Sequence, residues 1–335
     1  MLPTLKLLLD GKALDRAQAR RAMGELMEGR ATQAQIGAFL AALRLRGETF
    51  EELVGFAEAL RERAVPVKVN RSPLLDTCGT GGDGGGTFNV STTAAFIAAG
   101  AGAAVAKHGN RSVSSRCGSA DVLEALGVKT EVAPEQAARC VEEAGVGFLF
   151  APALHPAVRH AGPARKELGS RTVFNLLGPL VNPAGAKRQL LGVYAVSLVP
   201  VVARALQALG SEEALVVSSC DGLDEFSLLA PSRVAHLKDG KIREYEFDPS
   251  SLGLSRYPRE AFAGGGAEDN AKILLGVLRG VKGAARDLSL LNGAAALIAA
   301  GLAGDFPEAL EKAGESVDGG RALKALEDLK RLSHE

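Results

Sequence analysis

The chain has 335 residues, 47% of them hydrophobic and 23% charged, a composition typical of a globular protein with a sizeable core. Lysine plus arginine and aspartate plus glutamate number 39 each, so the chain lacks the overall positive charge of nucleic-acid-binding proteins. The four cysteines fit no zinc-binding spacing, and we expect free thiols in a reducing compartment.

The N-terminal part, up to about residue 65, is predicted to be entirely helical. Apolar residues recur three and four apart over 15–29, 32–47 and 49–64. Glu51 and Glu52 follow Thr49 in the first turn of the third segment, where the helix dipole favours carboxylates. Pro66 ends this pattern. The N-terminus has no signal-peptide pattern, so we expect a cytoplasmic protein without a membrane partner.

From Leu74 onward, strand-like and helix-like runs alternate. Strands are expected at 74–79, 102–109, 127–132, 146–152, 188–196 and 213–220, and helices at 91–102, 119–127, 134–145 and 199–210. Asp239 and Gly240 predict a hairpin within 233–247. The apolar run 290–306 is short for a membrane span, so we expect a buried helix there. The alternation predicts crossover units and a mostly parallel sheet.

A glycine-rich loop, CGTGGDGGGTFNVST over 78–92, joins the first expected strand to a helix that begins near Ser91. Glycine lets the backbone approach a phosphate closely, and the free N–H groups of a helix N-terminus favour anions. Asn89, Ser91 and Thr92 add side-chain donors there, and Gly84–Gly86 suggest a loop that closes over a ligand. The loop lacks the lysine of a Walker motif and the acidic residue of a dinucleotide site. It predicts an anion site of another kind, with a capped surface turn as the alternative.

A basic loop, KHGNRSVSSRCGSAD over 107–121, follows the next expected strand and should emerge at the same edge of the sheet. Lys107, Arg111 and Arg116 supply positive charge, and Ser119 is expected to cap the following helix. Neutral polar contacts come from Asn110, Ser114, Ser115 and Ser119. One glycine-rich and one basic loop at neighbouring strand ends favour a polyanionic ligand over a merely solvated surface.

An acidic turn, SCDGLDEFS, places Asp221, Asp224 and Glu225 after a further strand. Carboxylates beside a polyphosphate site suggest Mg²⁺, which keeps several waters and bridges phosphate to one or two carboxylates. The alternative is an acidic turn without a metal.

The segment 155–183 is locally basic, and His155 and Arg165 within it could bind a carboxylate. Its histidines could equally be structural. The sequence offers no evident Ser/His/Asp or Cys/His pairing for nucleophilic catalysis.

Six strings in this order resemble the anthranilate phosphoribosyltransferase family: GTGGD (79–83), FNVST (88–92), KHGNR (107–111), SSRCGSAD (114–121), HPAVRHAGPARKELGSRTVFNLLGPLVNPA (155–184) and DGLDE (221–225). The resemblance implies an α/β fold of the nucleoside phosphorylase type. A small all-helical domain, 1–66, would be completed by a helical segment around 165–180. A larger α/β domain, 72–335, would hold a central, mostly parallel sheet flanked by helices.

The resemblance also implies an activity. The phosphoribosyl group of 5-phosphoribosyl-1-diphosphate (PRPP) would pass to the amine of anthranilate, with release of diphosphate, in tryptophan biosynthesis. It implies Mg²⁺ as cofactor and a homodimer formed through the helical domain, with no nucleic-acid partner. Val158, Gly162 and Ala164 depart from the family pattern beside the expected anthranilate channel.

Roles for individual residues follow from the resemblance alone. PRPP would be bound by Gly79, Gly82, Asp83, Thr87, Asn89, Val90, Ser91, Thr92, Lys107, Asn110, Arg111, Ser115 and Ser119. Anthranilate would be bound by Gly79, Asn110, His155 and Arg165, and Mg²⁺ by Ser91, Asp224 and Glu225. We expect no general base, because an aromatic amine is neutral at pH 7 and catalysis can rest on positioning and charge stabilisation.

Two other functions compete with this one. A pyrimidine nucleoside phosphorylase has the same type of fold but needs no diphosphate-bound Mg²⁺, which the acidic turn argues against. A non-catalytic binding protein, for instance of nucleic acid, is disfavoured by the balanced charge and the intact acidic pair.

Overall fold

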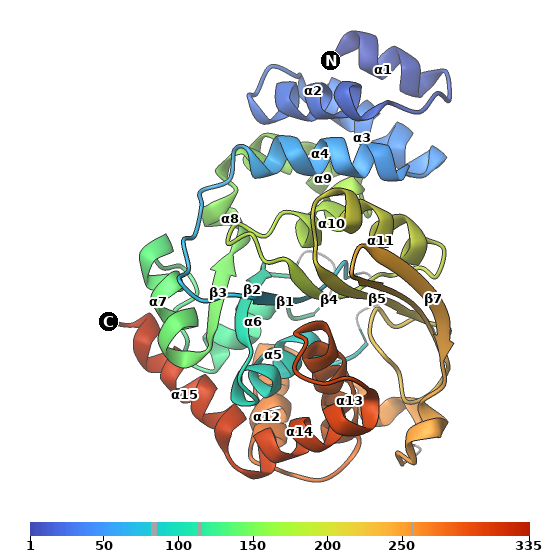
Figure 1. Cartoon of the computed structure of the whole chain (residues 1–335). Coiled ribbons are helices and arrows are strands. Elements are labelled where there is room, and N and C mark those ends of the chain that lie inside the picture. Colours follow the sequence, from blue (N-terminus) through green and yellow to red (C-terminus); the bar gives the residue numbers. More distant parts are fainter. Residues whose placement is uncertain (82–85, 113–115, 256) are drawn as a thin grey trace.

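The structure is a computed structural model that describes residues 1–81, 86–112, 116–255 and 257–335 (Figure 1). Four helices form a layer at the N-terminus: α1 (Leu2–Leu9), α2 (Arg16–Met27), α3 (Gln33–Arg46) and α4 (Phe50–Arg61). The helices α2, α3 and α4 each begin with a capping box, set by Asp15, Thr32 and Thr49. The all-helical N-terminal prediction is therefore confirmed, with boundaries close to those expected.

Packing within this layer requires a small residue at one point. A Cβ at Gly55 of α4 would lie 2.3 Å from the carbonyl oxygen of Arg16, so glycine lets α2 and α4 approach closely. The buried carboxylate of Glu52 accepts a hydrogen bond of 2.9 Å from the backbone N–H of Leu14 and pairs with Arg46. One residue thus links α4 to the α1–α2 loop and to the end of α3.

The described residues beyond these helices are built around one sheet of seven strands in the order β3-β2-β1-β4-β5-β6-β7. The first five strands pair in parallel, and β6 and β7 continue the sheet antiparallel. The strands are β1 (Leu74–Gly79), β2 (Ala104–Gly109), β3 (Val146–Phe150), β4 (Arg188–Gly192), β5 (Glu213–Ser219), β6 (Ser232–Lys238) and β7 (Lys241–Phe247). Asp239 and Gly240 both have positive φ between β6 and β7, which confirms the predicted hairpin.

Helices cover both faces of this sheet (Figure 1). They are α5 (Val90–Gly100), α6 (Ser119–Ala125), α7 (Pro134–Ala144), α8 (Ala151–Leu154), α9 (Gly162–Leu168), α10 (Val173–Leu177), α11 (Leu198–Ala208), α12 (Ala267–Leu278), α13 (Ala284–Ala299), α14 (Phe306–Asp318) and α15 (Arg321–Ser333). Short 3₁₀ helices are η1 (Pro156–Ala161), η2 (Gly178–Leu180), η3 (Pro249–Leu252) and η4 (Arg259–Phe262). The predicted fold, a small helical domain beside a larger α/β domain, is confirmed.

Alternating side chains of the central strands enter two different hydrophobic cores. Leu190 of β4 and Leu215 of β5 pack with α5 and α13, whereas Leu191 and Val216 pack in a core shared with the N-terminal helices. The buried helix expected near 290–306 is α13, in which every residue from Leu288 to Ala299 is buried. Within the described residues, no helix combines the length and apolar character that a membrane crossing requires.

The segment containing α9 and α10 lies against the N-terminal helices. Gln33 of α3 accepts a hydrogen bond from the backbone N–H of Ala164 (3.2 Å), and Arg61 of α4 donates one to the carbonyl oxygen of Leu180 (2.8 Å). These contacts agree with a helical domain completed by 165–180. The boundaries 1–66 and 72–335 themselves stay a prediction.

One expected strand is wrong. Residues 127–132 form an irregular connection between α6 and α7, not a strand. Val128 and Val132 pack in different cores, and the N–H of Lys129 donates to Ser333 Oγ of α15 at 3.0 Å. The alternation of β-branched residues here reflects packing between helices rather than strand pairing. The strands expected at 146–152 and 188–196 are also shorter than predicted, ending at Phe150 and Gly192.

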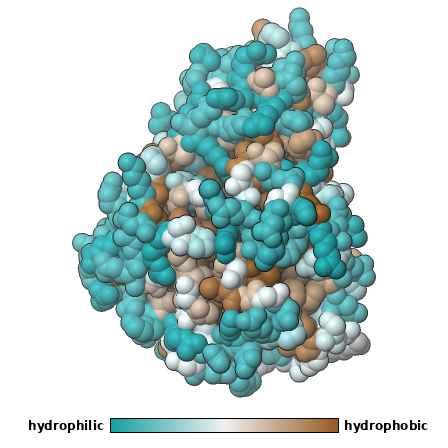
Figure 2. Space-filling view, in the orientation of Figure 1, coloured by the Kyte–Doolittle hydropathy of each residue, from teal (hydrophilic) through white to brown (hydrophobic). Residues whose placement is uncertain are grey.

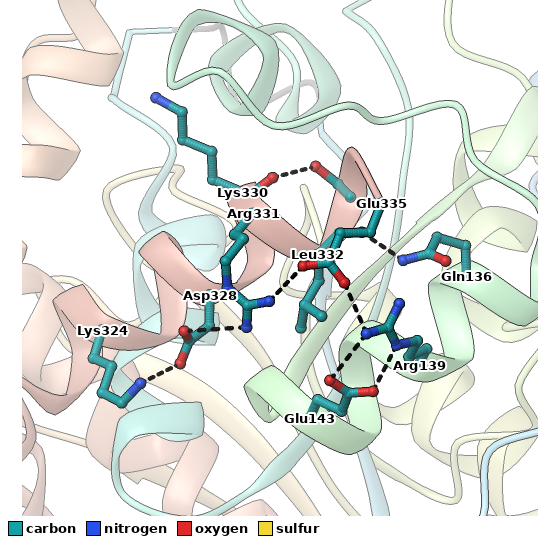
Figure 3. A network of polar contacts seen from close by, with 10 residues as sticks. Gln136, Arg139, Glu143, Lys324, Asp328, Lys330, Arg331, Leu332 and Glu335 are labelled. Carbon is teal, nitrogen blue, oxygen red and sulfur yellow. Dashed lines mark hydrogen bonds and ion pairs between the residues drawn. The ribbon is translucent and has the colours of Figure 1, made fainter.

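The C-terminal helix α15 is attached to α7 by a network of polar contacts, shown in Figure 3. Arg139 of α7 pairs with Glu143 and with Glu335 at 2.6 and 2.7 Å, and Gln136 donates to the carbonyl oxygen of Leu332. Exposed ion pairs contribute at most about 1 kcal/mol each. The larger contribution comes from the buried apolar face of α15, in which Leu326, Leu329 and Leu332 take part.

Candidate active site

A pocket of about 550 Å³ opens at the carboxyl ends of β1 and β2, between the sheet and the α8–α10 segment. The glycine-rich loop, the basic loop, the segment after β3 and the acidic turn all contribute to its wall. Every residue that the family resemblance assigns to the site and that the structure describes lines it, whereas Arg116 and Asp221 do not: the lining residues are Gly79, Thr87, Asn89, Val90, Ser91, Thr92, Lys107, Asn110, Arg111, Ser119, His155, Arg165, Asp224 and Glu225. Gly82, Asp83, Ser114 and Ser115 lie outside the described residues, as do Gly84 and Gly85 of the suggested closing loop.

Much of the face seen in Figure 2 is hydrophilic, although hydrophobic residues show between the hydrophilic ones in its centre. The pocket wall is mixed in the same way, with Phe88, Val158 and Phe174 among its polar residues. A pocket of this composition suits a ligand with one highly charged end and one aromatic end.

The glycine-rich loop places Asp224 against the end of β1. The N–H of Gly81, which has φ of 63°, donates to Asp224 Oδ2 at 2.9 Å. A Cβ at Gly79 would lie 2.6 Å from the same oxygen. Glycine at these two positions therefore lets a carboxylate from the acidic turn lie directly on the loop.

The N-terminus of α5 faces the pocket with several polar groups. Asn89 Nδ2 donates to the carbonyl oxygen of Cys117 (3.2 Å), and Asn89 Oδ1 accepts from Asn270 Nδ2 (3.0 Å). Asn89 is thus held by its neighbours and does not cap the helix through its side chain. Thr92 Oγ1 is buried and has no hydrogen-bond partner among the described residues. An orphaned hydroxyl beside a helix N-terminus fits an anionic ligand.

Lys107 lies beneath this helix terminus. Its side chain is 3% exposed, and its ammonium donates to the carbonyl oxygen of Thr77 and to Ser91 Oγ, the latter at 3.3 Å. Burial lowers the pKa of Lys107, and the negative charges of Asp76 and Glu225 oppose that shift. The ammonium is therefore held at the N-terminal turn of α5, within electrostatic range of the two acidic residues.

Arg165 of α9 lies at the opposite end. Its guanidinium carbon is 5.0 Å from the ring centroid of Phe174, and burial lowers the pKa of Arg165. Among the described residues no carboxylate lies within 4.0 Å of it. A partly buried guanidinium that lacks a counter-ion in the described part of the chain is suited to an acidic ligand.

Comparisons with known proteins agree with this geometry. Residues 2–64 match the model of the glycosyl transferase family helical bundle domain, and residues 71–323 match that of the glycosyl transferase family a/b domain. An anthranilate phosphoribosyltransferase of Symbiobacterium thermophilum is 51% identical over 334 residues, covering 100% of this chain and 98% of that protein. The chain belongs to the anthranilate phosphoribosyltransferase family.

Solved structures of this family superpose over nearly the whole chain. The crystal structure from Thermus thermophilus has a TM-score of 0.93 and 45% identity, covering 99% of both chains. A Saccharomyces cerevisiae structure in complex with PRPP and Mg has a TM-score of 0.91 at 30% identity, with 99% of this chain and 97% of that one covered. The same yeast protein in complex with 4-fluoroanthranilate has a TM-score of 0.89 at 30% identity, again with 99% of this chain and 97% of that one covered.

Membership of the anthranilate phosphoribosyltransferase family makes the chain a glycosyltransferase of tryptophan biosynthesis, as the sequence predicted. The nucleoside phosphorylase alternative is set aside, because the full-length relatives share the anthranilate activity.

Four details of the predicted family site differ from expectation. Arg111 lines the rim, but its guanidinium pairs with Glu124 at 2.5 Å. The N-cap of α6 is Gly118, not Ser119, because the carboxylate of Asp121 accepts from the Gly118 N–H at 2.7 Å. The other two details concern Asp221 and Ala164.

Asp221 is turned away from the pocket and accepts a hydrogen bond from Ser227 Oγ at 2.7 Å. Ala164 is buried in the core of the N-terminal helices, so only Val158 and Gly162 of the three departures from the family pattern lie at the pocket. The acidic contribution to the site thus comes from Asp224 and Glu225.

Three residues that line the pocket or contact its lining were not identified from the sequence. A Cβ at Gly192, the last residue of β4, would lie 1.5 Å from the carbonyl oxygen of Asp224. Asn270 of α12 is fixed by the Gly265 N–H (2.7 Å) and orients Asn89. His108 lines the pocket beside His155, with ring centroids 5.1 Å apart. Glycine at a strand end was a usable signal for Gly192, whereas no local pattern marks Asn270.

The two histidines are neutral in the folded protein. Burial lowers the pKa of His108 to about 3 and that of His155 to about 4. His108 Nδ1 is 3.1 Å from the carbonyl oxygen of Gly178, which can only accept, so Nδ1 carries the proton. Nε2 of both rings is buried without a partner among the described residues. His155 also hydrogen-bonds to the backbone of Val181, which leaves its Nε2 unprotonated, so each ring offers one hydrogen-bond acceptor at this end of the pocket.

The lowered histidine pKa values predict acid sensitivity. The unfolded chain binds protons at about pH 6.5, and the folded chain does so only at much lower pH. The contribution of each neutral imidazole to the free energy of unfolding is therefore present above pH 6.5 and is lost as the pH falls below that value. Between pH 7 and 5.5 we expect a loss of about 1 kcal/mol for each ring.

Urea unfolding at both pH values tests this, with His108→Gln as the variant. The variant should lose less stability on acidification than the parent, by about 1 kcal/mol. The raised pKa of Asp76, about 6, acts in the opposite direction in both proteins and cancels in their difference. An identical pH dependence in parent and variant would contradict the prediction.

Proposed function

We propose that this chain joins anthranilate to C1 of PRPP, with release of diphosphate, in the pocket described above. The supporting observation is that one cavity unites an anion-binding helix terminus, a buried ammonium and an acidic pair at one end with a guanidinium and two neutral imidazoles at the other. These are the groups that a diphosphate ester and an aromatic carboxylate require.

We assign the PRPP end to the glycine-rich and basic loops. The proposed contacts are Gly79, Gly82, Asp83, Thr87, Asn89, Val90, Ser91, Thr92, Lys107, Asn110, Arg111, Ser115 and Ser119. The N-terminus of α5, with the buried hydroxyl of Thr92, would receive diphosphate oxygens. The ammonium of Lys107, which donates to Ser91 Oγ, would offset the negative charge of these diphosphate oxygens. Arg111 would contribute only after leaving Glu124.

Magnesium would be held by Ser91, Asp224 and Glu225. The donor set fits a hard cation, because all three side chains offer oxygen and two of them are carboxylates at the pocket wall. Among the described residues, no three histidine, cysteine or acidic side chains gather into a metal cluster. Binding would therefore be shared with ligand phosphate and water. When bound, Mg²⁺ would neutralise part of the charge on the departing diphosphate.

Anthranilate would meet Gly79, Asn110, His155 and Arg165. The guanidinium of Arg165 would pair with the carboxylate, and the neutral imidazoles would accept hydrogen bonds from the amine. No residue is needed as a general base, because the attacking nitrogen is uncharged. The protein's contribution is to align the two substrates and to stabilise the charge of the leaving group.

Arg165→Ala is expected to raise the KM for anthranilate by about 10- to 100-fold, because a charge-assisted hydrogen bond contributes about 1.5–3 kcal/mol. The KM for PRPP should change less than about threefold. The anthranilate KM of Arg165→Lys should lie between those of the parent and of Arg165→Ala, since lysine keeps the charge but not the bidentate geometry. Lys166→Ala, an exposed neighbour on α9, is the control. An unchanged anthranilate KM in Arg165→Ala would remove Arg165 from this role.

The decisive assay for the function mixes the protein with PRPP, Mg²⁺ and anthranilate and follows anthranilate fluorescence. We expect the fluorescence to fall with time and to require all three components. Phosphorolysis of thymidine without any loss of anthranilate would indicate a nucleoside phosphorylase. Inactivity in both assays would favour a binding protein.

We also propose a cytoplasmic homodimer formed through the helical domain, with that domain comprising 1–66 and 165–180 and the catalytic domain 72–335. Support comes from exposed leucines in the helical layer. Leu2 and Leu9 of α1 are 58% and 66% exposed, and Leu45 of α3 is 89% exposed. Apolar side chains of this size are commonly covered in an oligomer.

A further inference from the structure

The strands β1 and β2 separate below the pocket. They pair only at Leu74–Ala104 and Leu75–Val105, although both strands continue for four more residues. Beyond this point β1 remains paired with β4 up to Gly79, and β2 remains paired with β3 up to Gly109. The β1–β2 ladder therefore ends part-way along the two strands, and we call the unpaired stretch toward the carboxyl edge the split.

Side chains satisfy the backbone groups that face this split. The N–H of His108 donates to Asp76 Oδ1 (3.1 Å), and Asn182 Nδ2 donates to the carbonyl oxygen of Ala106 (2.8 Å). Asn182 Nδ2 also donates to Asp76 Oδ2 (2.9 Å). On the other side of the split, the carbonyl oxygen of Thr77 accepts from Lys107 Nζ. We call Asp76 and Asn182, 0% and 6% exposed, the seam pair.

The seam pair joins both ends of the pocket. Asp76 holds the backbone of His108, and the adjacent Lys107 lies under the phosphate-binding end. Asn182 belongs to the segment that carries Gly178, whose carbonyl oxygen receives the His108 ring. That segment is anchored to the helical layer through Arg61, and to the connection between α4 and β1 through the hydrogen bond of 3.1 Å from the Val67 N–H to the carbonyl oxygen of Pro183.

We infer that Asp76 and Asn182 are positioning residues, which hold β2 at one spacing from β1 and so fix Lys107 and His108 relative to the glycine-rich loop that follows β1. The inference rests on the proposed roles of the two pocket ends. Asp76 does not itself line the pocket. Because both of its oxygens accept hydrogen bonds, it acts as an ionised carboxylate, although burial raises its pKa to about 6.

An exchange of donor and acceptor tests this inference. Asn182→Asp removes the donor to Asp76 and Ala106 and places two carboxylates together. We expect kcat to fall at least about tenfold, with both KM values within about threefold, because misalignment of bound substrates affects turnover more than binding. The double variant D76N/N182D restores the bond between residues 76 and 182, with its direction reversed. We expect it to regain at least about fivefold in kcat over N182D.

Glu213→Gln is the matched control. Glu213 is a buried carboxylate at the opposite edge of the sheet, bound to His236 and Lys238. The substitution should lower Tm without changing kcat. Each kcat is measured at a temperature where circular dichroism shows the variant to be folded.

The proposal is overturned if N182D is folded and keeps the parental kcat, if D76N/N182D is no more active than N182D, or if E213Q loses as much activity. If neither N182D nor the double variant folds at any temperature, the pair is a folding requirement and the proposal is equally wrong. Absence of turnover in the parent would refute the proposed function instead.

Discussion

Replacing Asp224 by asparagine together with Glu225 by glutamine is expected to lower kcat/KM for PRPP by at least about a hundredfold. Both substitutions preserve shape, and the amide oxygen introduced in place of the Asp224 carboxylate can still accept the Gly81 N–H. The fold should therefore persist while the negative charge of the acidic pair is lost. The Mg²⁺ concentration for half-maximal rate should rise at least about tenfold.

The control for this double variant is Asp221→Asn in the same turn. Asp221 is bonded to Ser227 and Leu223 and does not line the pocket, so the kinetics of this variant should match the parent within about twofold. Magnesium titrations that coincide for parent and D224N/E225Q would show that the metal site is wrongly assigned. Equal losses in D221N and the double variant would mean that the whole turn was disturbed.

The fold was largely predictable because its signals are local. Capping residues at Asp15, Thr32 and Thr49 mark helix starts, and apolar periodicity marks the helices themselves. The error at 127–132 has the same origin. A run of β-branched residues reports burial, and only tertiary contacts such as Lys129 with Ser333 decide whether the partner is a strand or a helix.

The site was predictable to the extent that it lies at strand ends. In a parallel sheet the loops after β1, β2 and β5 emerge at one edge, so polar residues in those loops meet. Asn270 and Asn182 could not be assigned this way, because their roles depend on contacts with residues far away in the chain. Arg111 lines the pocket, but its ion pair with Glu124 depends on side-chain direction, which spacing in the sequence does not give.

Lys107→Met is expected to separate activity from stability. Methionine keeps the length and most of the volume of lysine but cannot donate to Ser91 Oγ or offset phosphate charge. We expect kcat/KM for PRPP to fall about a hundredfold, with the anthranilate KM within about threefold.

Tm should stay equal or rise in this variant, because burying an ammonium costs free energy that an apolar side chain avoids. Lys238→Met on β6, far from the pocket, is the control and should leave kinetics unchanged. Steady-state kinetics and thermal melts on the same samples distinguish a structural role of the ammonium from a direct effect of its charge on PRPP. If kcat/KM and Tm fall together, the ammonium acts mainly through its bond to Thr77 and supports the strand ends. If kcat/KM falls alone, the charge itself acts on PRPP, which is what its place at the N-terminal turn of α5 predicts.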